Sequence, residues 1–383
     1  MEPSGGNGWG FPAGRVAIPR PTARSDLGDR CVGVIANPMS GRDIRRLTAR
    51  ASVFPNAEKT NMVLRLIAAA GALGVRRVLV STDSFGIAAS VLRVCQRRVN
   101  GRDGAWPEVE FCELDPPTGT ADDTRALVRQ MRVRGAGVIV LLGGDGTIRA
   151  AAPELGDTPV LPLSTGTNNA FPQMWEATVA GIAASLIAIG RVEDPRATYR
   201  AKLLRVETRA VTEVALVDVC VSTLSHVGAK ALWQPATLRA LYCTFAEPHA
   251  VGLSSIAGQL RPTSREHPGG VVLRLAGDSP AERSVLAPIA PGVLEPIGVL
   301  AADDMAIGES RLVDVPAGTI ALDGEREIEF GRGDRVSVTL TDAGPRVIDI
   351  PRVLAEAARR DLLAIPPGSP GTTETISTHA VPH

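Results

Sequence analysis

Aromatic residues, lysine and an excess of charge of either sign are all scarce in this sequence. Phe, Trp and Tyr make up 3% of the 383 residues, and Lys+Arg and Asp+Glu number 41 each. With few rings for base stacking and no net positive charge, a nucleic-acid partner is not expected. The only lysines are Lys59, Lys202 and Lys230, and none lies in a G-x-x-x-x-G-K-[ST] run. That absence excludes an ordinary Walker A loop.

Closely spaced cysteines and long apolar runs are also missing. The five cysteines form no C-x-x-C pair, which favours buried, reduced thiols in a cytoplasmic protein and argues against a zinc site. The longest apolar candidate, residues 177–190, is shorter than the roughly 20 residues that cross a membrane, so it predicts a buried helix and no membrane partner. The Gly- and Pro-rich ends, 1–29 and 365–383, are expected to be disordered tails.

What the sequence does contain, from residue 30 to 194, is an alternation of short apolar segments and amphipathic ones. It predicts a doubly wound α/β domain with strands at 31–36, 77–81, 108–114, 138–142 and 159–163, and helices at 58–73, 87–94, 122–134 and 177–190. From 195 to 345, short apolar segments between Gly, Pro and Asp turns predict a β-rich second domain, with 214–222 as one of its strands. A helix in 346–364 is expected to pack back on the first domain.

One expected strand, 138–142, runs directly into a glycine turn made of Gly143, Gly144, Asp145, Gly146 and Thr147. Glycines leave room for a bulky anion and can take positive φ, so that backbone N–H groups converge on a phosphate. A helix starting near Thr147 would add the positive end of its dipole. Asp145 would be repelled by that phosphate unless it serves a metal or a substrate hydroxyl. The alternative is that Asp145 only caps the helix.

Two more expected strands end in turns of small polar residues. The strand 31–36 is followed by Asn37, Ser40 and Gly41, at the carboxyl edge where open α/β sheets bind ligands. The alternative there is a plain loop in which Ser40 or Asp43 caps a helix. After the strand 159–163 comes Ser164 and then Thr165, Gly166, Thr167, Asn168 and Asn169. These groups could be simple turn caps, but facing the glycine turn they would complete a cradle for a triphosphate.

These motifs resemble those of known kinases. The run 143–147 resembles the GGDGT signature shared by NAD kinases and by diacylglycerol and sphingosine kinases, and 37–41 resembles their other phosphate-loop motif. The runs 287–297 and 321–336 are similar to the PI-x-PH-x-L and DG…GD-x-V stretches of NAD kinases. The closest resemblance, carried by 35–46, 51–54, Glu58-Lys59 and 164–172, is to AcoX proteins, NAD-kinase-like products of acetoin-catabolism loci. By this resemblance the chain is identified as an AcoX-like member of the ATP-NAD kinase family.

The resemblance implies an NAD kinase/diacylglycerol kinase-like fold, with the α/β domain and the β-rich domain facing each other across a cleft. It also implies NAD and ATP as substrates, Mg²⁺ or another divalent metal, and phosphoryl transfer to the adenosine ribose 2′-hydroxyl. Asp145 would then accept or orient the hydroxyl proton, while Asp218 and Ser255 would help to bind the nucleotide. We also expect a homo-oligomer.

Some positions depart from the NAD kinase pattern. Where NAD kinases have an Asn followed by Glu or Asp, this chain has Val217 and Asp218, and 252–258 only loosely matches their Ser-, Thr- and Gly-rich loop. The 165–169 turn looks like the GT-x-ND of lipid kinases, with Ala170 where their Asp would stand. Two alternatives therefore stay open: a kinase for lipids or other small alcohols, and a nucleotide-binding regulatory protein without catalysis. Asp323 could simply form a type I′ turn with Gly324.

Overall fold

The first domain is built on a mostly parallel sheet of seven strands. The computed structural model describes residues 31–41, 54–99, 106–166, 169–193, 195–224, 226 and 234–365, so the expected tails lie almost wholly outside the described residues. The sheet order is β3-β2-β1-β4-β5-β18-β6. The strands are β1 (Cys31–Ala36), β2 (Arg77–Ser81), β3 (Glu108–Cys112), β4 (Ala136–Gly143), β5 (Val160–Ser164), β6 (Thr198–Arg200) and β18 (Arg346–Ile348).

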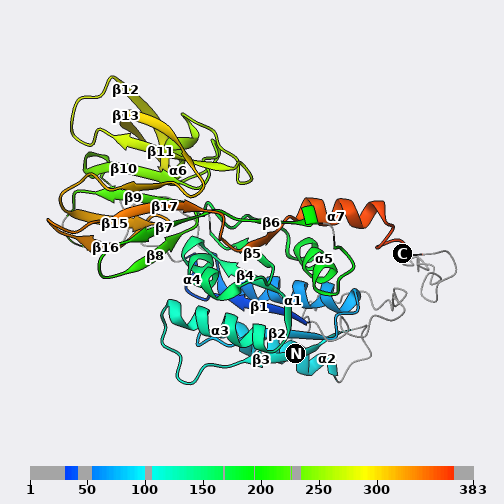
Figure 1. Ribbon diagram of the computed structural model, residues 1–383. Coiled ribbons are helices and arrows are strands. Elements are labelled where there is room, and N and C mark those ends of the chain that lie inside the picture. The colour runs from blue at the N-terminus through cyan, green and yellow to red at the C-terminus, as the bar shows by residue number, and fades with distance from the viewer. Residues whose placement is uncertain are drawn as a thin grey trace, which may run out of the picture.

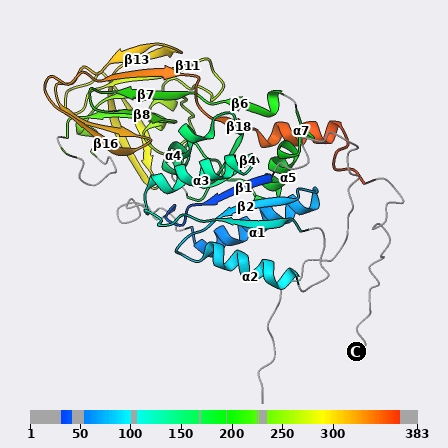
Figure 2. The same cartoon turned by 60° about the horizontal axis from the view of Figure 1, so that its bottom comes forward.

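Helices cover both faces of this sheet (Figures 1 and 2). One face carries α1 (Asn56–Ala72), α2 (Ile87–Val99), α5 (Ala177–Ala188) and α7 (Ile350–Arg359); the other carries α3 (Ala121–Val133) and α4 (Asp145–Leu155). Alternate residues of β4 enter the two cores, since Val138 and Val140 join the first and Ile139 and Leu141 the second. This explains the uninterrupted apolar run of β4. The predicted doubly wound α/β architecture is confirmed.

The apolar run 177–190 forms the buried helix α5, as predicted. Its small residues allow a close approach to α1, because a Cβ added to Gly181 would lie 2.8 Å from Ala69 Cβ and 3.2 Å from Leu66 Cα. A helix that is apolar all round suits a position between the sheet, α1 and α7. In the described ranges no helix is long and apolar enough to cross a bilayer.

The β-rich second domain consists of two sheets. The larger has the order β12-β13-β11-β10-β9-β15-β16 and the smaller β14-β17-β7-β8, and one apolar core has residues from both. The strands are β7 (Leu203–Glu207), β8 (Thr212–Ala215), β9 (Asp218–Ser222), β10 (Leu238–Cys243), β11 (Gly269–Leu275), β12 (Arg283–Ala290), β13 (Val293–Ala306), β14 (Ser310–Leu312), β15 (Gly318–Leu322), β16 (Glu325–Phe330) and β17 (Ser337–Thr341). The short helix α6 (Ser254–Gly258) packs against β12.

The chain passes between the two domains twice. β6 pairs antiparallel with β18, and β18 pairs parallel with β5, so both strands extend the first sheet although they flank the β-rich segment in sequence. The boundary expected at residue 195 therefore falls before β6. After β18 the chain forms α7, which packs against α5.

The expectation of one strand over 214–222 was wrong. The chain forms β8 in the smaller sheet and β9 in the larger one, with Leu216 and Val217 between them. There the backbone N–H groups of Leu216 and Val217 donate to the side chain of Asp323 at 3.0 and 2.7 Å instead of to a neighbouring strand. A carboxylate distant in sequence thus interrupts the ladder.

Candidate active site

Two of the polar turns, 37–41 after β1 and 143–147 after β4, follow adjacent strands at the point where the strand order reverses. β2 and β3 extend the sheet on one side of β1, while β4 and β5 lie on the other side. Ala36 and Leu142 are register partners, and the turns that follow them are bonded to each other. Asn37 donates from its backbone N–H to Leu142 O at 3.0 Å and from its side-chain Nδ2 to Thr147 Oγ1 at 2.8 Å. Ligands of open α/β sheets bind at such a switch point.

The third turn, residues 164–169, is hydrogen-bonded to both of the others. Thr165 Oγ1 lies 2.7 Å from Ser40 Oγ, and the Thr165 backbone N–H donates to Gly143 O at 3.2 Å. Asn169 donates to Ser164 Oγ at 2.8 Å and lies against Gly144. The three turns singled out in the sequence therefore meet at one edge of the sheet. Two of their predicted ligand-binding residues, Thr167 and Asn168, lie outside the described residues.

The glycines of the 143–147 turn provide space and not unusual backbone angles. None of Gly143, Gly144 and Gly146 has positive φ, so the expectation that they would use it was wrong. The turn does not need positive φ because α4 begins directly at Asp145, with extended Gly144 as its N-cap at φ −107° and ψ −175°. The absence of a side chain matters at Gly144, because an added Cβ would lie only 2.7 Å from Asn169 Oδ1.

Asp145 faces the third turn. Its carboxylate accepts the backbone N–H of Ala170 at 3.0 Å and that of Phe171 at 2.7 Å. The N-cap of α4 is Gly144 and makes no side-chain capping bond, so the structure does not use Asp145 as the N-cap of its own helix. Hydrogen bonds from two backbone amides stabilise an ionised carboxylate and fix its orientation. A carboxylate fixed in this way is placed to accept a proton from a hydroxyl.

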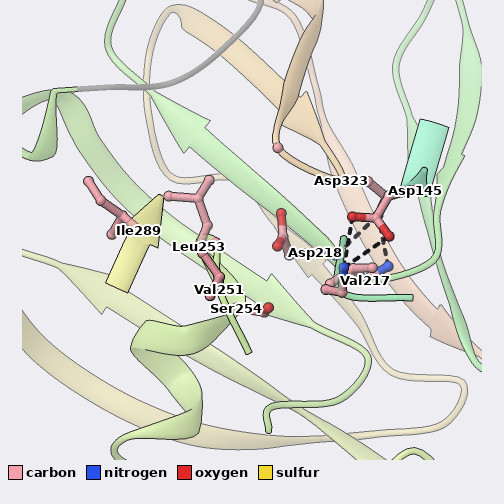
Figure 3. A pocket seen from close by; sticks show the side chains of 11 residues that line it. Asp145, Val217, Asp218, Val251, Leu253, Ser254, Ile289 and Asp323 are labelled. Carbon is pink, nitrogen blue, oxygen red and sulfur yellow. Dashed lines mark hydrogen bonds between the residues drawn. The ribbon is translucent and has the colours of Figure 1, made fainter. Parts of the chain in front are cut away.

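A pocket lies between Asp145 and the second domain. Figure 3 shows the three acids of its lining, Asp145, Asp218 and Asp323, together with apolar side chains of Val217, Leu253 and Ile289. In that view Asp218 lies between Asp323 and the side chains of Leu253 and Ile289. These residues come from the glycine turn, from the start of β9 and the residue before it, from the segment before α6, from β12 and from the β15–β16 turn, so no single motif predicts the pocket.

Ser255 does not line this pocket. Its hydroxyl is fully buried and donates to Gly252 O at 2.6 Å, whereas the neighbouring Ser254 is part of the lining. The sequence pattern singled out this loop, but which of its hydroxyls lines the pocket depends on how α6 packs.

Asp323 belongs to both a turn and the site. Asp323 and Gly324 have φ of 51° and 79°, the pair of positive angles found in a type I′ turn. The Asp323 side chain is 1% exposed, and Arg149 Nε lies 3.6 Å from its Oδ2. Burial and, to a smaller extent, the nearby Asp145 raise the pKa of this carboxyl, whereas Arg149 and the amides of Val217 and Leu216 lower it, and the net result is a pKa of about 7.

We predict that Asp323 makes the protein less stable as the pH rises from about 4 to 7. Its pKa in the folded state, about 7, is above the ordinary 3.8, so the folded state binds this proton more tightly than the unfolded one. The stabilisation is complete below pH 3.8 and is lost as the pH passes through 7. Urea unfolding of the wild type and of Asp323→Asn should show their difference in unfolding free energy falling over this range. A difference independent of pH would contradict the assignment.

Lys59 supports the 37–41 turn, a role that the sequence analysis missed. Its side chain is fully buried, and its Nζ donates to the carbonyls of Asn37 and Ser40 at 2.8 Å each and to Asn56 Oδ1 at 3.2 Å. The scarcity of lysine was a sequence signal for this role. In a chain whose positive charges are nearly all arginine, a lysine indicates a site that suits a compact ammonium better than a planar guanidinium.

Gly41 is the position where this turn most clearly requires glycine. Its φ is +72°, and an added Cβ would lie 2.6 Å from the carbonyl oxygen of Thr165. Gly41→Ala should lower the free energy of unfolding by about 2 to 3 kcal/mol, from left-handed strain together with displacement of the 165 turn. Gly74→Ala is the matched control, since Gly74 also has positive φ, +81°, but open space around it. Equal losses in urea unfolding would show that the close approach has no energetic weight.

No group of three or more His, Cys, Asp or Glu side chains within the described ranges is arranged to hold a metal ion.

Comparison with known proteins finds separate family matches in the two halves of the chain. Residues 32–192 match the family model of the ATP-NAD kinase N-terminal domain, and residues 202–343 match that of the acetoin catabolism protein X C-terminal domain. The acetoin catabolism protein X of Cupriavidus necator is 42% identical over 337 residues, which cover 87% of this chain and 93% of that protein. Among solved structures, yeast NADH kinase complexed with NADH is similar over 86% of this chain and 87% of that one, with 12% identity and a TM-score of 0.48. The family identified from the motifs is confirmed: the chain belongs to the acetoin catabolism protein X family, with the N-terminal domain of an ATP-NAD kinase.

Proposed function

We propose that this protein transfers the γ-phosphoryl group of ATP to the 2′-hydroxyl of the adenosine ribose of NAD, giving NADP. The observation that carries the proposal is the position of Asp145. Its carboxylate is held by two amide donors, lies at the N-terminus of α4 beside the three converging turns, and lines the pocket between the domains. A carboxylate beside a phosphate site is repelled unless it serves a metal or a substrate hydroxyl, and the proposal assigns Asp145 to the hydroxyl.

The chemistry requires little more than placement. The 2′-oxygen forms a bond to the γ-phosphorus while the bond from that phosphorus to the β,γ-bridging oxygen breaks, and ADP leaves. Asp145 takes the proton of the hydroxyl or aligns it for attack. Phosphoryl transfer depends mostly on positioning and on stabilising charge. The hydrogen bonds that tie the turns to one another would supply the positioning, and the N-terminus of α4 would help to stabilise the charge.

ATP would bind where the three turns meet. We expect its phosphates to be bound by backbone N–H groups and polar side chains of the residues predicted from the sequence: Asn37, Ser40, Gly41, Gly143, Gly144, Gly146, Thr147, Thr165, Gly166, Thr167, Asn168 and Asn169. The N-terminus of α4 adds favourable electrostatic potential for an anion. We treat Mg²⁺ as part of the substrate MgATP, because Mg²⁺ usually binds through substrate phosphates and one or two carboxylates. Asp218, which lines the pocket, would face the acceptor nucleotide.

A second candidate acceptor is a lipid or another small alcohol with apolar groups near its hydroxyl. The pocket is not wholly polar, because Leu253 and Ile289 line it and Val217 stands where NAD kinases carry an amide side chain. Losing an amide donor should weaken binding of the same ligand by about 1 to 3 kcal/mol unless another group replaces it. The apolar lining therefore favours two candidate acceptors, NAD and a small alcohol, for the same phosphoryl transfer.

The decisive experiment is to incubate the purified protein with ATP, Mg²⁺ and NAD and to measure NADP with an NADP-specific dehydrogenase. NADP formation that is lost in Asp145→Asn would support the proposal and would exclude a contaminating kinase. ADP release with diacylglycerol or a short-chain alcohol, but not with NAD, would favour the second candidate. If calorimetry shows NAD and ATP binding without product for any acceptor, the protein is a nucleotide-binding regulator instead.

A further inference from the structure

Arg265 of the second domain contacts the same short segment that holds Asp145. Its Nη1 donates to Phe171 O at 2.7 Å, and its Nη2 donates to Ala170 O. Arg265 lies between β10 and β11 in sequence, 120 residues after Asp145. A cation from one domain and a carboxylate from the other therefore bind opposite sides of one backbone segment.

The peptide unit between Ala170 and Phe171 connects the two charges. Its carbonyl oxygen accepts from Arg265, and its N–H donates to Asp145 Oδ1 at 2.7 Å. A cation on the carbonyl side and an anion on the N–H side polarise the peptide in the same direction, so each hydrogen bond strengthens the other. Arg265 thereby favours the orientation of the peptide that presents its N–H to Asp145.

Arg265 is itself held firmly. Its side chain is 13% exposed and forms a two-point pair with Glu247, with Nε and Nη2 each 3.1 Å from a carboxylate oxygen. Its guanidinium carbon lies 4.4 Å from the ring centroid of Phe245. A guanidinium held by a carboxylate, an aromatic face and two carbonyls has little freedom to move.

A second buried lysine, Lys202, stabilises the loop that carries Arg265. Lys202 Nζ donates to the carbonyls of Ser264, His267 and Gly269 at 3.3, 2.7 and 2.6 Å. The ammonium closes the loop at three points, on both sides of Arg265. The position of the guanidinium is thus set by the β-rich domain and imposed on the turn of the α/β domain.

We propose that Arg265 is a positioning residue, which orients Asp145 for proton acceptance through the Ala170–Phe171 peptide and ties that orientation to the packing of the two domains. The inference rests on the proposed function for the role of Asp145. Without Arg265 the peptide loses its preferred orientation and the carboxylate moves relative to the acceptor hydroxyl. Small misplacements of a reacting group affect turnover more than affinity.

Steady-state kinetics of Arg265→Met and Arg265→Lys test this role. Arg265→Met should lower kcat roughly tenfold while KM for ATP stays within about twofold, and Arg265→Lys should recover part of kcat because an ammonium can still reach a carbonyl. The matched control is Arg261→Met, a nearby arginine that donates to Ala302 O and Asp304 away from Asp145. Its kcat should stay close to that of the wild type. Equal losses for Arg265→Met and Arg261→Met, or no recovery in Arg265→Lys, would overturn the proposal.

A second measurement does not depend on activity. Urea unfolding midpoints of the wild type, Arg265→Met, Asp145→Asn and the double variant form a thermodynamic cycle. Coupling through the peptide predicts a smaller shift for Arg265→Met in the Asp145→Asn background than in the wild type, and additive shifts would refute it. If the wild type forms no NADP but the shifts are coupled, the proposed function fails while the physical link from Arg265 to Asp145 stands.

Discussion

Replacing Asp145 with Asn should reduce the rate of NADP formation by on the order of a hundredfold or more. The amide keeps one oxygen that can accept an N–H from Ala170 or Phe171, but it cannot take the proton of the acceptor hydroxyl. It also removes the negative charge that the two amide donors are arranged to hold. Affinity for ATP should be equal or somewhat higher, because a carboxylate close to the phosphates repels them.

The measurement is kcat with NAD as the acceptor, together with ATP binding by calorimetry. Asp122→Asn is a suitable control, because Asp122 also lies in the first turn of a helix but its side chain is 69% exposed and pairs only with Arg125 at the surface. We expect that variant to keep wild-type turnover. An Asp145→Asn enzyme with unchanged turnover would remove Asp145 from the mechanism and leave it a structural brace for the third turn.

Replacing Lys59 with Met should lower both the stability of the fold and the affinity for ATP. Methionine fills a similar volume but removes the ammonium that donates to the half-buried carbonyls of Asn37 and Ser40, of which Asn37 O keeps the Ser40 hydroxyl as a donor. We expect a loss of about 1 to 3 kcal/mol in the free energy of unfolding, which is the cost of leaving one acceptor unsatisfied. The 37–41 turn would no longer be held against Thr147 and Thr165, so ATP should bind on the order of tenfold more weakly.

Urea unfolding and calorimetry with ATP measure the two effects. Arg65→Met is the matched control, because Arg65 is a cation on the same helix, is 35% exposed and pairs with Glu58 and Glu176 at the surface. Surface pairs contribute about 1 kcal/mol or less, and Arg65 does not contact the 37–41 turn through any of these bonds. If Lys59→Met lost stability but bound ATP as the wild type does, Lys59 would support the fold without shaping the nucleotide site.

The sequence by itself determined the doubly wound domain and the three turns at its edge. A strand such as β4 can be predicted from its continuous apolar run, because both of its faces are buried. Turns at strand ends can be predicted from glycine and small polar residues, because few other residues fit there. The alternation of strands and helices predicts a sheet whose polar turns share its carboxyl edge, and the structure adds the strand order that makes β1 and β4 neighbours. Asp145 could therefore be singled out before its partners were known.

Only the tertiary structure decided what surrounds Asp145. The amides of Ala170 and Phe171, the carboxylate of Asp323 and the guanidinium of Arg265 approach from segments far apart in the chain, and no local pattern encodes such contacts. The break between β8 and β9 has the same origin, because Asp323 takes the N–H groups that a ladder would have used. Local sequence specifies an element when its own periodicity decides burial, but a site between two domains depends on charges and hydrogen bonds that exist only after both domains have folded.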